Sequence, residues 1–265
     1  MSEFFVKKRN GRLEKLNLDK INKCVIRACQ GINDVSASEV ILDAQVQLFN
    51  KITTNEIDKA LIMSARSKIE KDPGYSVVAA RLLLNTIYKE VFGEGVDSDV
   101  FGMQYHKSFV TNLKALTKAG RIDKKMLSEF DLNKIAKSLS PERDSLWKYL
   151  GIQTVYDRYL LHINGRRMET PQGFWMRVAM GLAINEENKD EKAIEFYDLL
   201  SKNLFINGTP TLFNSGTTHP QLSSCYLSTV DDSINGIFGT IHNQACLSKF
   251  AGGLGVDWTP IRGSS

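Results

Sequence analysis

The chain has 265 residues, of which 42% are hydrophobic and 24% are charged, and its formal net charge is +4. This composition is sufficient for ordinary hydrophobic cores in one large or two smaller domains. No apolar run approaches the roughly 20 residues that a membrane span needs, and charged residues stand where a signal peptide would need its apolar core. We therefore expect a soluble protein in the cytoplasm.

The four cysteines, Cys24, Cys29, Cys225 and Cys246, are too few for a disulfide framework in a chain of this length. None of them has the spacing of zinc ligands. We expect reduced thiols and no metal site in this chain.

The first 30 residues are basic, with eight Lys or Arg residues against three acids. A solvated basic face is the simplest interpretation. A binding surface for a small polyanion such as a nucleoside triphosphate is the second, and a nucleic-acid surface is the third. Few aromatic residues are interleaved with the charges, which disfavours nucleic acid.

Residues 4–16 are predicted to form a β-hairpin, because Asn10-Gly11 favours a type I′ turn. Asp19 can cap the first of four helices that follow, and Thr53 with Glu56 has the pattern of a capping box. The last of the four is strongly apolar and should be central to a bundle. The predicted helices are at 19–30, 38–48, 53–71 and 75–92.

The middle of the chain is less informative. Residues 96–150 are mixed and basic, with short helical patterns at 126–137 and no residue that we single out for chemistry. Pro171 suits the first turn of a helix, and a further helix is expected at 192–202. Among the aromatic residues here, Tyr156, Tyr159 and Trp175 are expected in the core and not in a redox relay.

From residue 204 the hydrophobic periodicity changes to short β-type runs, at 204–206 and 223–227. An amphipathic helix is expected at 233–250. Strand, loop, helix and strand in this order are typical of the start of an α/β barrel. Open strand edges in such a partial barrel need a cover.

Cys225 follows two serines and precedes a glycine-rich loop at 252–255. A single cysteine without a CxxC pattern is more often a small buried hydrophobic residue than a reactive group. The loop lacks the third glycine of GxGxxG and follows a helical pattern, so it is not a Rossmann motif. Its glycines do allow backbone N–H groups to approach a phosphate or a substrate oxygen closely.

The order of the motifs in this region is more specific than any one of them. They are Thr-Pro-Thr-Leu-Phe-Asn (209–214), Pro-Gln-Leu-Ser-Ser-Cys (220–225), Asp-Asp-Ser-Ile (231–234), and Ala-Gly-Gly-Leu-Gly-Val (251–256) followed by Ile-Arg (261–262). In succession they closely resemble the large catalytic subunit of class I ribonucleotide reductases. The wording of residues 154–161 and 169–183 is similar to the helical domain of that family. The small hairpin on a four-helix bundle, with Val-Lys-Lys-Arg-Asn-Gly-Arg (6–12) and Leu-Asp-Lys-Ile (18–21), looks like an ATP cone.

This resemblance implies a mainly α fold with α/β elements. The expected parts are an ATP cone of a hairpin and four helices at 1–95, a helical domain at 96–203, and the first strands of a ten-stranded α/β barrel with the specificity loop at 204–265. The family reduces ribonucleoside diphosphates to deoxyribonucleotides by dithiol and radical chemistry.

The resemblance also assigns roles to residues of the barrel part. Cys225 corresponds to one of the two thiols that reduce the ribose. The residues matched to the substrate are Thr209, Ser224, Gly252 and Gly253. Those matched to the effector that sets substrate specificity are Asp232, with Ser233 beside it, and Arg262; Asp231 replaces Asp232 if the turn is shifted by one residue.

In the cone, the resemblance assigns nine residues to the ATP or dATP effector that controls activity. They are Val6, Lys8, Arg9, Glu14, Asn17, Lys20, Thr54, Asp58 and Lys89. Some relatives have His in place of Asp58, and some have a second lysine in place of Glu90. Inhibition by dATP therefore stays open, and a cone that folds without regulating is the alternative.

The second thiol, the radical-forming cysteine and the radical-relay tyrosines of the family have no match here. We expect the chain to be inactive alone, and to act with a complementary C-terminal fragment and a small subunit that carries a di-iron radical centre. The assembled large subunit is expected to be a homodimer, without a nucleic-acid or membrane partner. A truncated reductase is the alternative origin.

Two other functions stay open. The first is a nucleotide-binding regulatory module, which would have no reason to keep Thr209, Ser224 and Cys225 together. The second is a cysteine-nucleophile transferase, which needs His219 or His242 to fold back onto Cys225.

Overall fold

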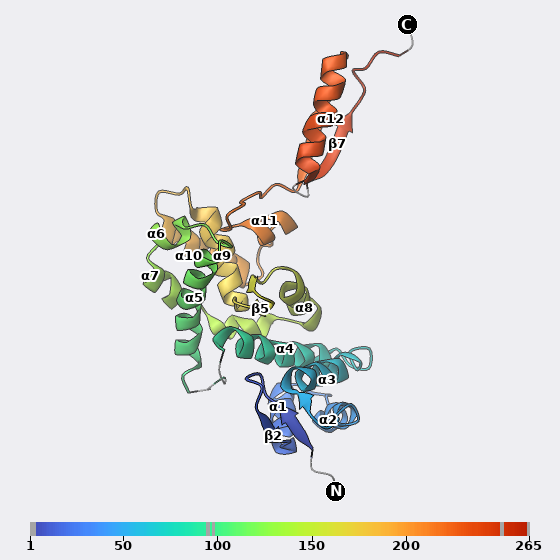
Figure 1. Cartoon of the computed structure of the whole chain (residues 1–265), viewed down its shortest axis with the longest axis vertical. Helices are drawn as coiled ribbons and strands as arrows, with labels where there is room; N and C mark the ends of the chain where they lie inside the picture. The colour runs from blue at the N-terminus through green and yellow to red at the C-terminus, as the bar shows by residue number, and fades with distance from the viewer. Residues whose placement is uncertain (1–3, 94–95, 97–98, 250–251, 264–265) are drawn as a thin grey trace. The chain divides into compact units, whose positions relative to one another are not determined.

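The computed structural model describes residues 4–93, 96, 99–249 and 252–263 (Figure 1). The chain forms two compact units, one from residues 1–116 and 139–174 and the other from 117–138 and 175–265. The domain boundaries near residues 95 and 203 stay predictions. Among the described residues, no helix is both long and apolar enough to cross a membrane.

The predicted N-terminal hairpin is confirmed. Strands β1 (Phe5–Lys7) and β2 (Leu13–Lys15) pair antiparallel, with Val6 opposite Glu14. The predicted type I′ turn is wrong. Gly11 has a φ of +83° while Asn10 is not in the left-handed region, and Lys8 N–H donates to the Arg12 carbonyl at 2.8 Å. The loop is therefore a longer turn that ends in a glycine bulge.

A third strand, β3 (Ile52–Thr53), lies parallel to β1 and gives a sheet of order β2-β1-β3. Sequence patterns did not predict it, because two residues are too short to show alternation. It brings the start of the third helix beside the hairpin. Thr53 thereby belongs to the sheet and also caps the helix.

Four helices complete this part: α1 (Leu18–Cys29), α2 (Ala37–Gln45), α3 (Thr54–Arg66) and α4 (Gly74–Phe92). The apolar α4 packs against α1, α3 and α8, which confirms its central place. Gly93 ends it with a φ of +74°. The Thr53–Glu56 capping box is also confirmed. The cap predicted for α1 is wrong: Asn17 has the extended backbone of an N-cap, and Asp19 lies in the first turn.

The first unit continues with α5 (Phe101–Lys118), the 3₁₀ helix η1 (Pro141–Leu146), α8 (Tyr149–Arg158), the small hairpin β4 (His162–Ile163) and β5 (Arg166–Arg167), and the start of α9 (Pro171–Ala183). The boundary between the units falls within α5 and α9. Pro171 opens α9 as predicted. Tyr159 and Trp175 are buried, as expected of core residues, whereas Tyr156 is only half-buried.

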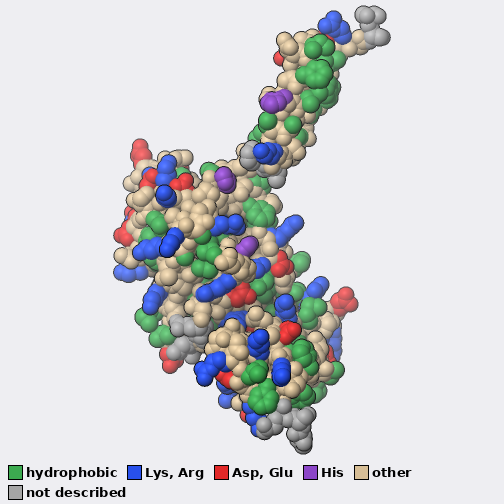
Figure 2. Space-filling view, in the orientation of Figure 1, with side chains coloured by type: hydrophobic (Ala, Val, Ile, Leu, Met, Phe, Trp, Pro, Cys, Tyr) green, Lys and Arg blue, Asp and Glu red, His purple; other side chains and the backbone are tan. Residues whose placement is uncertain are grey.

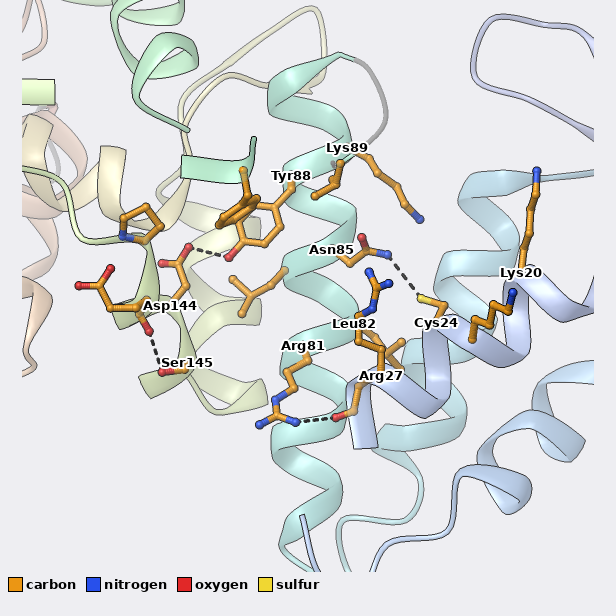
Figure 3. Close-up of a pocket in the computed structure, with 17 residues that line it drawn as sticks. Lys20, Cys24, Arg27, Arg81, Leu82, Asn85, Tyr88, Lys89, Asp144 and Ser145 are labelled. Carbon is orange, nitrogen blue, oxygen red and sulfur yellow. Dashed lines mark hydrogen bonds between the residues drawn. The ribbon is translucent and has the colours of Figure 1, made fainter. Parts of the chain in front are cut away.

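A buried polar network centres on Asp144 of η1, which is 3% exposed. Its carboxylate accepts a hydrogen bond from Tyr88 at 2.7 Å (Figure 3), and it also accepts from Tyr105 and Gln172, each at 2.8 Å. Burial raises the pKa of Asp144 to about 6, although the three donors favour the ionised form. The sequence of residues 96–150 gives no signal for this network, because its members come from four separate elements.

The second unit contains α6 (Lys125–Ser128), α7 (Leu132–Lys137), α10 (Lys189–Ser201) and α11 (Thr209–Asn214). The fully buried Arg177 of α9 donates to the Ser215 carbonyl at 2.8 Å. A Cβ added at Gly181 would lie 2.2 Å from the backbone nitrogen of Gly216. Two glycines therefore let α9 approach the turn that follows α11.

The strand predicted at 204–206 is wrong. Residues 204–206 form an irregular segment, and Leu204 and Ile206 are each 70% exposed. Instead, the Thr-Pro-Thr motif opens helix α11, because Pro210 suits the first turn after the extended Gly208. The apolar side chains of residues 204–206 suggest a strand, but a strand also needs neighbouring strands to pair with, and apolar character alone does not supply them.

At the C-terminal end, β6 (Cys225–Thr229) and β7 (Gly253–Asp257) pair in parallel, with Cys225 opposite Gly253. Helix α12 (Ile234–Lys249) connects them, and the predicted end of this helix at Phe250 lies outside the described residues. Hydrophobic side chains lie on the surface of this segment (Figure 2); Leu227, for example, is 89% exposed. The fold is thus mainly helical and ends in one β-α-β unit.

Candidate functional site

A cavity of about 200 Å³ lies in the first unit among the hairpin, α1, α3 and α4. Eight of the nine residues assigned to the activity effector line it. They are Val6, Lys8, Glu14, Asn17, Lys20, Thr54, Asp58 and Lys89. Residues from the hairpin to the end of α4 therefore meet at one place, although their role in binding stays a prediction.

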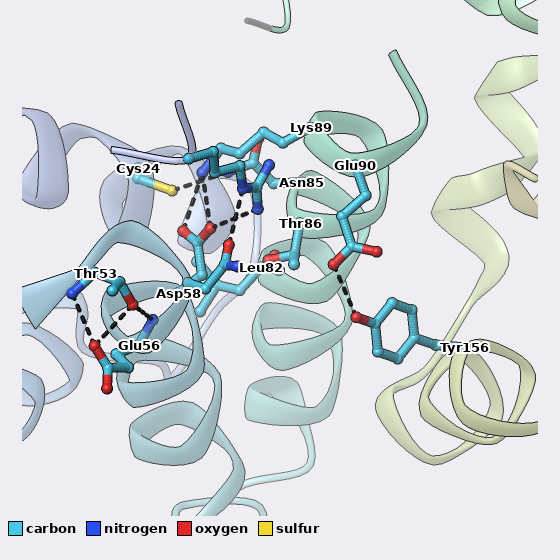
Figure 4. A network of polar contacts seen from close by, with 12 residues as sticks. Cys24, Thr53, Glu56, Asp58, Leu82, Asn85, Thr86, Lys89, Glu90 and Tyr156 are labelled. Atoms are coloured by element: carbon cyan, nitrogen blue, oxygen red, sulfur yellow. Dashed lines mark hydrogen bonds and ion pairs between the residues drawn. The ribbon is translucent and has the colours of Figure 1, made fainter. Parts of the chain in front are cut away.

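The charges in this cavity are partly paired (Figure 4). Asp58 is 8% exposed and lies 3.0 Å from Nζ of Lys89, while Lys8 lies 3.6 Å from Glu14. Lys20 is exposed and forms no ion pair within the described part of the chain. Lysines suit phosphate oxygens, and carboxylates suit the hydroxyl or amino groups of a nucleoside. The cavity offers both kinds of group.

Arg9 does not line the cavity. Its guanidinium donates to the side-chain oxygen of Asn55 at 2.8 Å and lies 3.3 Å from Asp58. Glu90 is also turned elsewhere, since its carboxylate accepts from the Tyr156 hydroxyl at 2.9 Å. The acid that replaces a lysine of some relatives is thus engaged outside the cavity (Figure 4).

Cys24 also lines the cavity and was missed from the sequence. It follows Lys20 by four residues on α1, and this helical spacing was the available signal. Its sulfur accepts from the Asn85 amide at 3.5 Å. Burial is the main cause that raises the pKa of this thiol, and Lys89 opposes it. Cys24 is therefore held as a neutral thiol at pH 7.

Asn17 has a local structural role in addition to its place in the cavity. Its side chain accepts from Lys20 N–H at 3.1 Å and so caps α1. The cap also fixes the direction in which α1 begins.

The second candidate site is the exposed Cys225, the first residue of β6. The Ser224 hydroxyl donates to its sulfur at 3.5 Å, and Gly253 N–H donates to the Ser224 carbonyl at 2.8 Å. Within the described residues, Cys225 has no hydrogen bond to a histidine. His242 lies 3.7 Å from Cys246 instead, which does not favour a cysteine–histidine nucleophile at Cys225.

Both glycines expected near the substrate are also required by strand packing. A Cβ at Gly252 would lie 2.6 Å from the ring of Tyr226, and one at Gly253 would lie 3.2 Å from the Ser224 carbonyl. A side chain at either position would therefore disturb the pairing of β6 with β7. This packing explains the glycines without a ligand.

Of the residues assigned to the specificity effector, Asp232 and Ser233 lie between β6 and α12, and Arg262 follows β7. Arg262 and Asp232 form a salt bridge of 2.8 Å, with the arginine largely exposed. The Ser233 hydroxyl accepts from Gly236 N–H at 3.0 Å, near the start of α12. The backbone carbonyl of Asp231 accepts from Ser233 N–H. Thr209, which is assigned to the substrate, is the first residue of α11. No group of three metal-binding side chains occurs among the residues that the structure describes.

Three protein-family models match the chain. The ATP cone domain matches residues 4–90, the ribonucleotide reductase all-alpha domain matches 146–220, and the ribonucleotide reductase barrel domain matches 223–265. Together they define a protein with the regulatory cone, the helical domain and the start of the barrel of a ribonucleotide reductase. The mainly helical fold that ends in a β-α-β unit agrees with this class.

Curated relatives are similar over nearly the whole chain. The subunit alpha of the ribonucleoside-diphosphate reductase of Chlamydia trachomatis is 45% identical over 237 residues, which are 89% of this chain and 22% of the relative. The corresponding subunit of Helicobacter pylori is 43% identical over 97% of this chain and 32% of the relative. The large chain of Schizosaccharomyces pombe is 38% identical over 97% of this chain and 31% of the relative.

The chain therefore spans between about a fifth and a third of the length of these relatives. It belongs to the family of ribonucleoside-diphosphate reductase large subunits and corresponds to their N-terminal part.

Proposed function

We propose that this chain provides the N-terminal part of a large subunit that reduces ribonucleoside diphosphates to deoxyribonucleotides. The observation that carries the proposal is the exposed Cys225 at the start of β6, with the Ser224 hydroxyl 3.5 Å from its sulfur. A thiol for reaction with a bound ribose must be accessible, and a purely structural cysteine is usually buried. The relatives, which are named reductase subunits, give the reaction class.

In the proposed reaction, Cys225 donates a proton to the leaving 2′-hydroxyl group of the ribose. The 2′-hydroxyl leaves as water, and a hydrogen replaces it on carbon. This reduction takes two electrons, which two thiols supply as they form a disulfide. Cys225 is one of these thiols, and further reductase polypeptide supplies the other. Thr209, Ser224 and the backbone at Gly252 and Gly253 contact the substrate.

Regulation is the second part of the proposal. In the cavity of the cone, Lys8, Lys20 and Lys89 bind the phosphates of ATP or a deoxynucleoside triphosphate, and Glu14 and Asp58 bind its nucleoside. In the barrel part, Arg262 binds the triphosphate of the specificity effector, and Asp232 binds its ribose. The salt bridge between Arg262 and Asp232 then opens when this effector binds.

The proposed partners follow from the same assignment. A complementary C-terminal part completes the barrel, a small subunit carries the di-iron radical centre, and two large subunits associate. The exposed apolar residues of β6 and α12, with Leu227 89% exposed, support the first of these. We place the reaction in the cytoplasm, with no nucleic-acid or membrane partner.

The test begins with purification of the chain from its native source under mild conditions and identification of co-purifying polypeptides by mass spectrometry. The assembled mixture is then assayed for reduction of cytidine diphosphate. We expect activity only when the remaining barrel and the small subunit are present. Cys225→Ser should abolish it, while Cys246→Ser, which also removes an exposed thiol, should not.

An active Cys225→Ser complex would refute the role of Cys225. A chain that binds nucleotide but supports no reduction with any added C-terminal part would leave a regulatory module instead. Ser224→Ala separates the two functions, since it should impair reduction and leave nucleotide binding by the cone unchanged.

A further inference from the structure

A second and larger cavity, of about 630 Å³, lies in the first unit over α4, between α1 and η1 (Figure 3). It shares Lys20, Cys24 and Lys89 with the smaller cavity of the cone. Its other lining residues belong to neither of the sites described above. The two cavities are therefore neighbours with partly common walls.

The wall formed by α4 is largely apolar. Leu82 and Leu84 are buried, with 4% and 5% of their surfaces exposed, and Tyr88 lies one turn beyond Leu84. The Tyr88 ring meets the Phe101 ring edge to face, with 5.0 Å between the centroids. Such a wall suits a flat or extended apolar group, because the transfer of apolar surface out of water is favourable.

The opposite wall, on α1, is cationic. Lys20, Lys23 and Arg27 lie three and four residues apart, so they share one face of the helix. All three are exposed and form no ion pair among the residues described. Arg81 is different, because its guanidinium already donates to the carbonyls of Ala28 and Gln30 at 2.9 and 2.7 Å.

Most polar groups of the cavity already have partners. Asp144 accepts from Tyr88, Tyr105 and Gln172, and the Asn85 amide donates to Cys24. A nucleobase would have to compete for Asp144 and for the Asn85 amide with these existing partners, which disfavours it here. An anionic head group, in contrast, finds uncommitted cations on α1.

We propose that this cavity binds an amphipathic anion, with its acidic head group at Lys23 and Arg27 and its apolar body on Leu82, Leu84 and Tyr88. Such a ligand is chemically distinct from the nucleotide assigned to the smaller cavity. Because Lys20 and Lys89 border both cavities, the anion also weakens binding of ATP, and ATP weakens binding of the anion by the same factor.

The test uses the whole chain and the fluorescent anion 8-anilinonaphthalene-1-sulfonate, which joins an aromatic body to one sulfonate. We expect a saturable site whose dissociation constant rises about tenfold or more in Lys23→Glu/Arg27→Glu, because two attractions become repulsions. The control Lys114→Glu/Lys118→Glu reverses two exposed lysines at the same spacing on α5. It should bind the probe like the unaltered chain.

A second variant fills the cavity from its rim. Ser145 is exposed on η1 and borders only the larger cavity, so Ser145→Trp should abolish the site. The affinity for ATP, measured by calorimetry, should stay within about twofold because no group of the smaller cavity changes. Ser128→Trp, at another exposed serine, is the matched control.

Probe binding that neither variant weakens would overturn the proposal. So would calorimetry that finds two ATP molecules per chain, with the second lost in Ser145→Trp, since the larger cavity would then be a nucleotide site. Neither result depends on reductase activity.

Discussion

The most direct test of the buried network is the substitution Asp144→Asn. It keeps the shape of the side chain and removes its titration. Asp144 is 3% exposed, and burial raises its pKa from 3.8 to about 6. The folded chain therefore holds a proton on this group at pH values where the unfolded chain has lost it.

The sign of the effect follows from proton linkage. Between pH 3.8 and 6 the folded state binds more protons at Asp144 than the unfolded state, so the free energy of unfolding falls as the pH rises. The difference between the two pKa values corresponds to about 3 kcal/mol in total. Roughly 2 kcal/mol of this lies between pH 4.5 and 7.5.

We therefore expect the stability of the unaltered chain relative to Asp144→Asn to fall by about 2 kcal/mol between pH 4.5 and 7.5. Urea unfolding followed by circular dichroism at four pH values measures this difference. Asp157→Asn, at an exposed aspartate of α8, is the control, because it removes a carboxyl group that is not buried. A constant difference for Asp144→Asn would refute the argument from burial.

Three further predictions concern a helix cap, a close backbone contact and a cation. Ser36→Ala should lower the free energy of unfolding by about 1 kcal/mol, because the Ser36 hydroxyl caps α2, whereas the exposed Ser38→Ala should leave it nearly unchanged in urea titrations. Gly181→Ala should lower the free energy of unfolding by about 1–3 kcal/mol or more in thermal unfolding, since its Cβ would lie 2.2 Å from the backbone nitrogen of Gly216. The control Gly239→Ala, in open space on α12, should not destabilise the chain. Equal melting temperatures for Gly181→Ala and the unaltered chain would contradict the packing. Lys20→Met should weaken ATP binding about tenfold by calorimetry, with Lys114→Met as the control, and an unchanged affinity would remove Lys20 from the phosphate site.

Local patterns in the sequence predicted the hairpin, the four helices that follow it and their central apolar member. The capping box at Thr53 and the stop at Gly93 are also local features, since each depends on residues within one turn. Such signals act over a few residues, so they survive without knowledge of the fold. The family was equally accessible, because its motifs are runs of neighbouring residues.

The same local reasoning was wrong at two places, where the sequence is compatible with more than one local structure. Asp19 and Asn17 are both capping residues, and only the backbone conformation decided for Asn17. The apolar run at 204–206 has the composition of a strand, but it pairs with no strand among the residues that the structure describes, and the following Thr-Pro-Thr forms a helix. A strand needs hydrogen bonds from elsewhere in the chain, which composition does not report.

The sequence by itself thus determined most elements of the first unit and, through its motifs, the family and the residues to examine. Only the tertiary structure decided that Lys8 and Lys89 border one cavity, and that Asp144 lies buried against Tyr88 and Tyr105. It also revealed the larger cavity between α1 and η1. The reason is physical: charge pairing, burial and cavities depend on distances between segments that are far apart in the chain, and no local pattern encodes those distances.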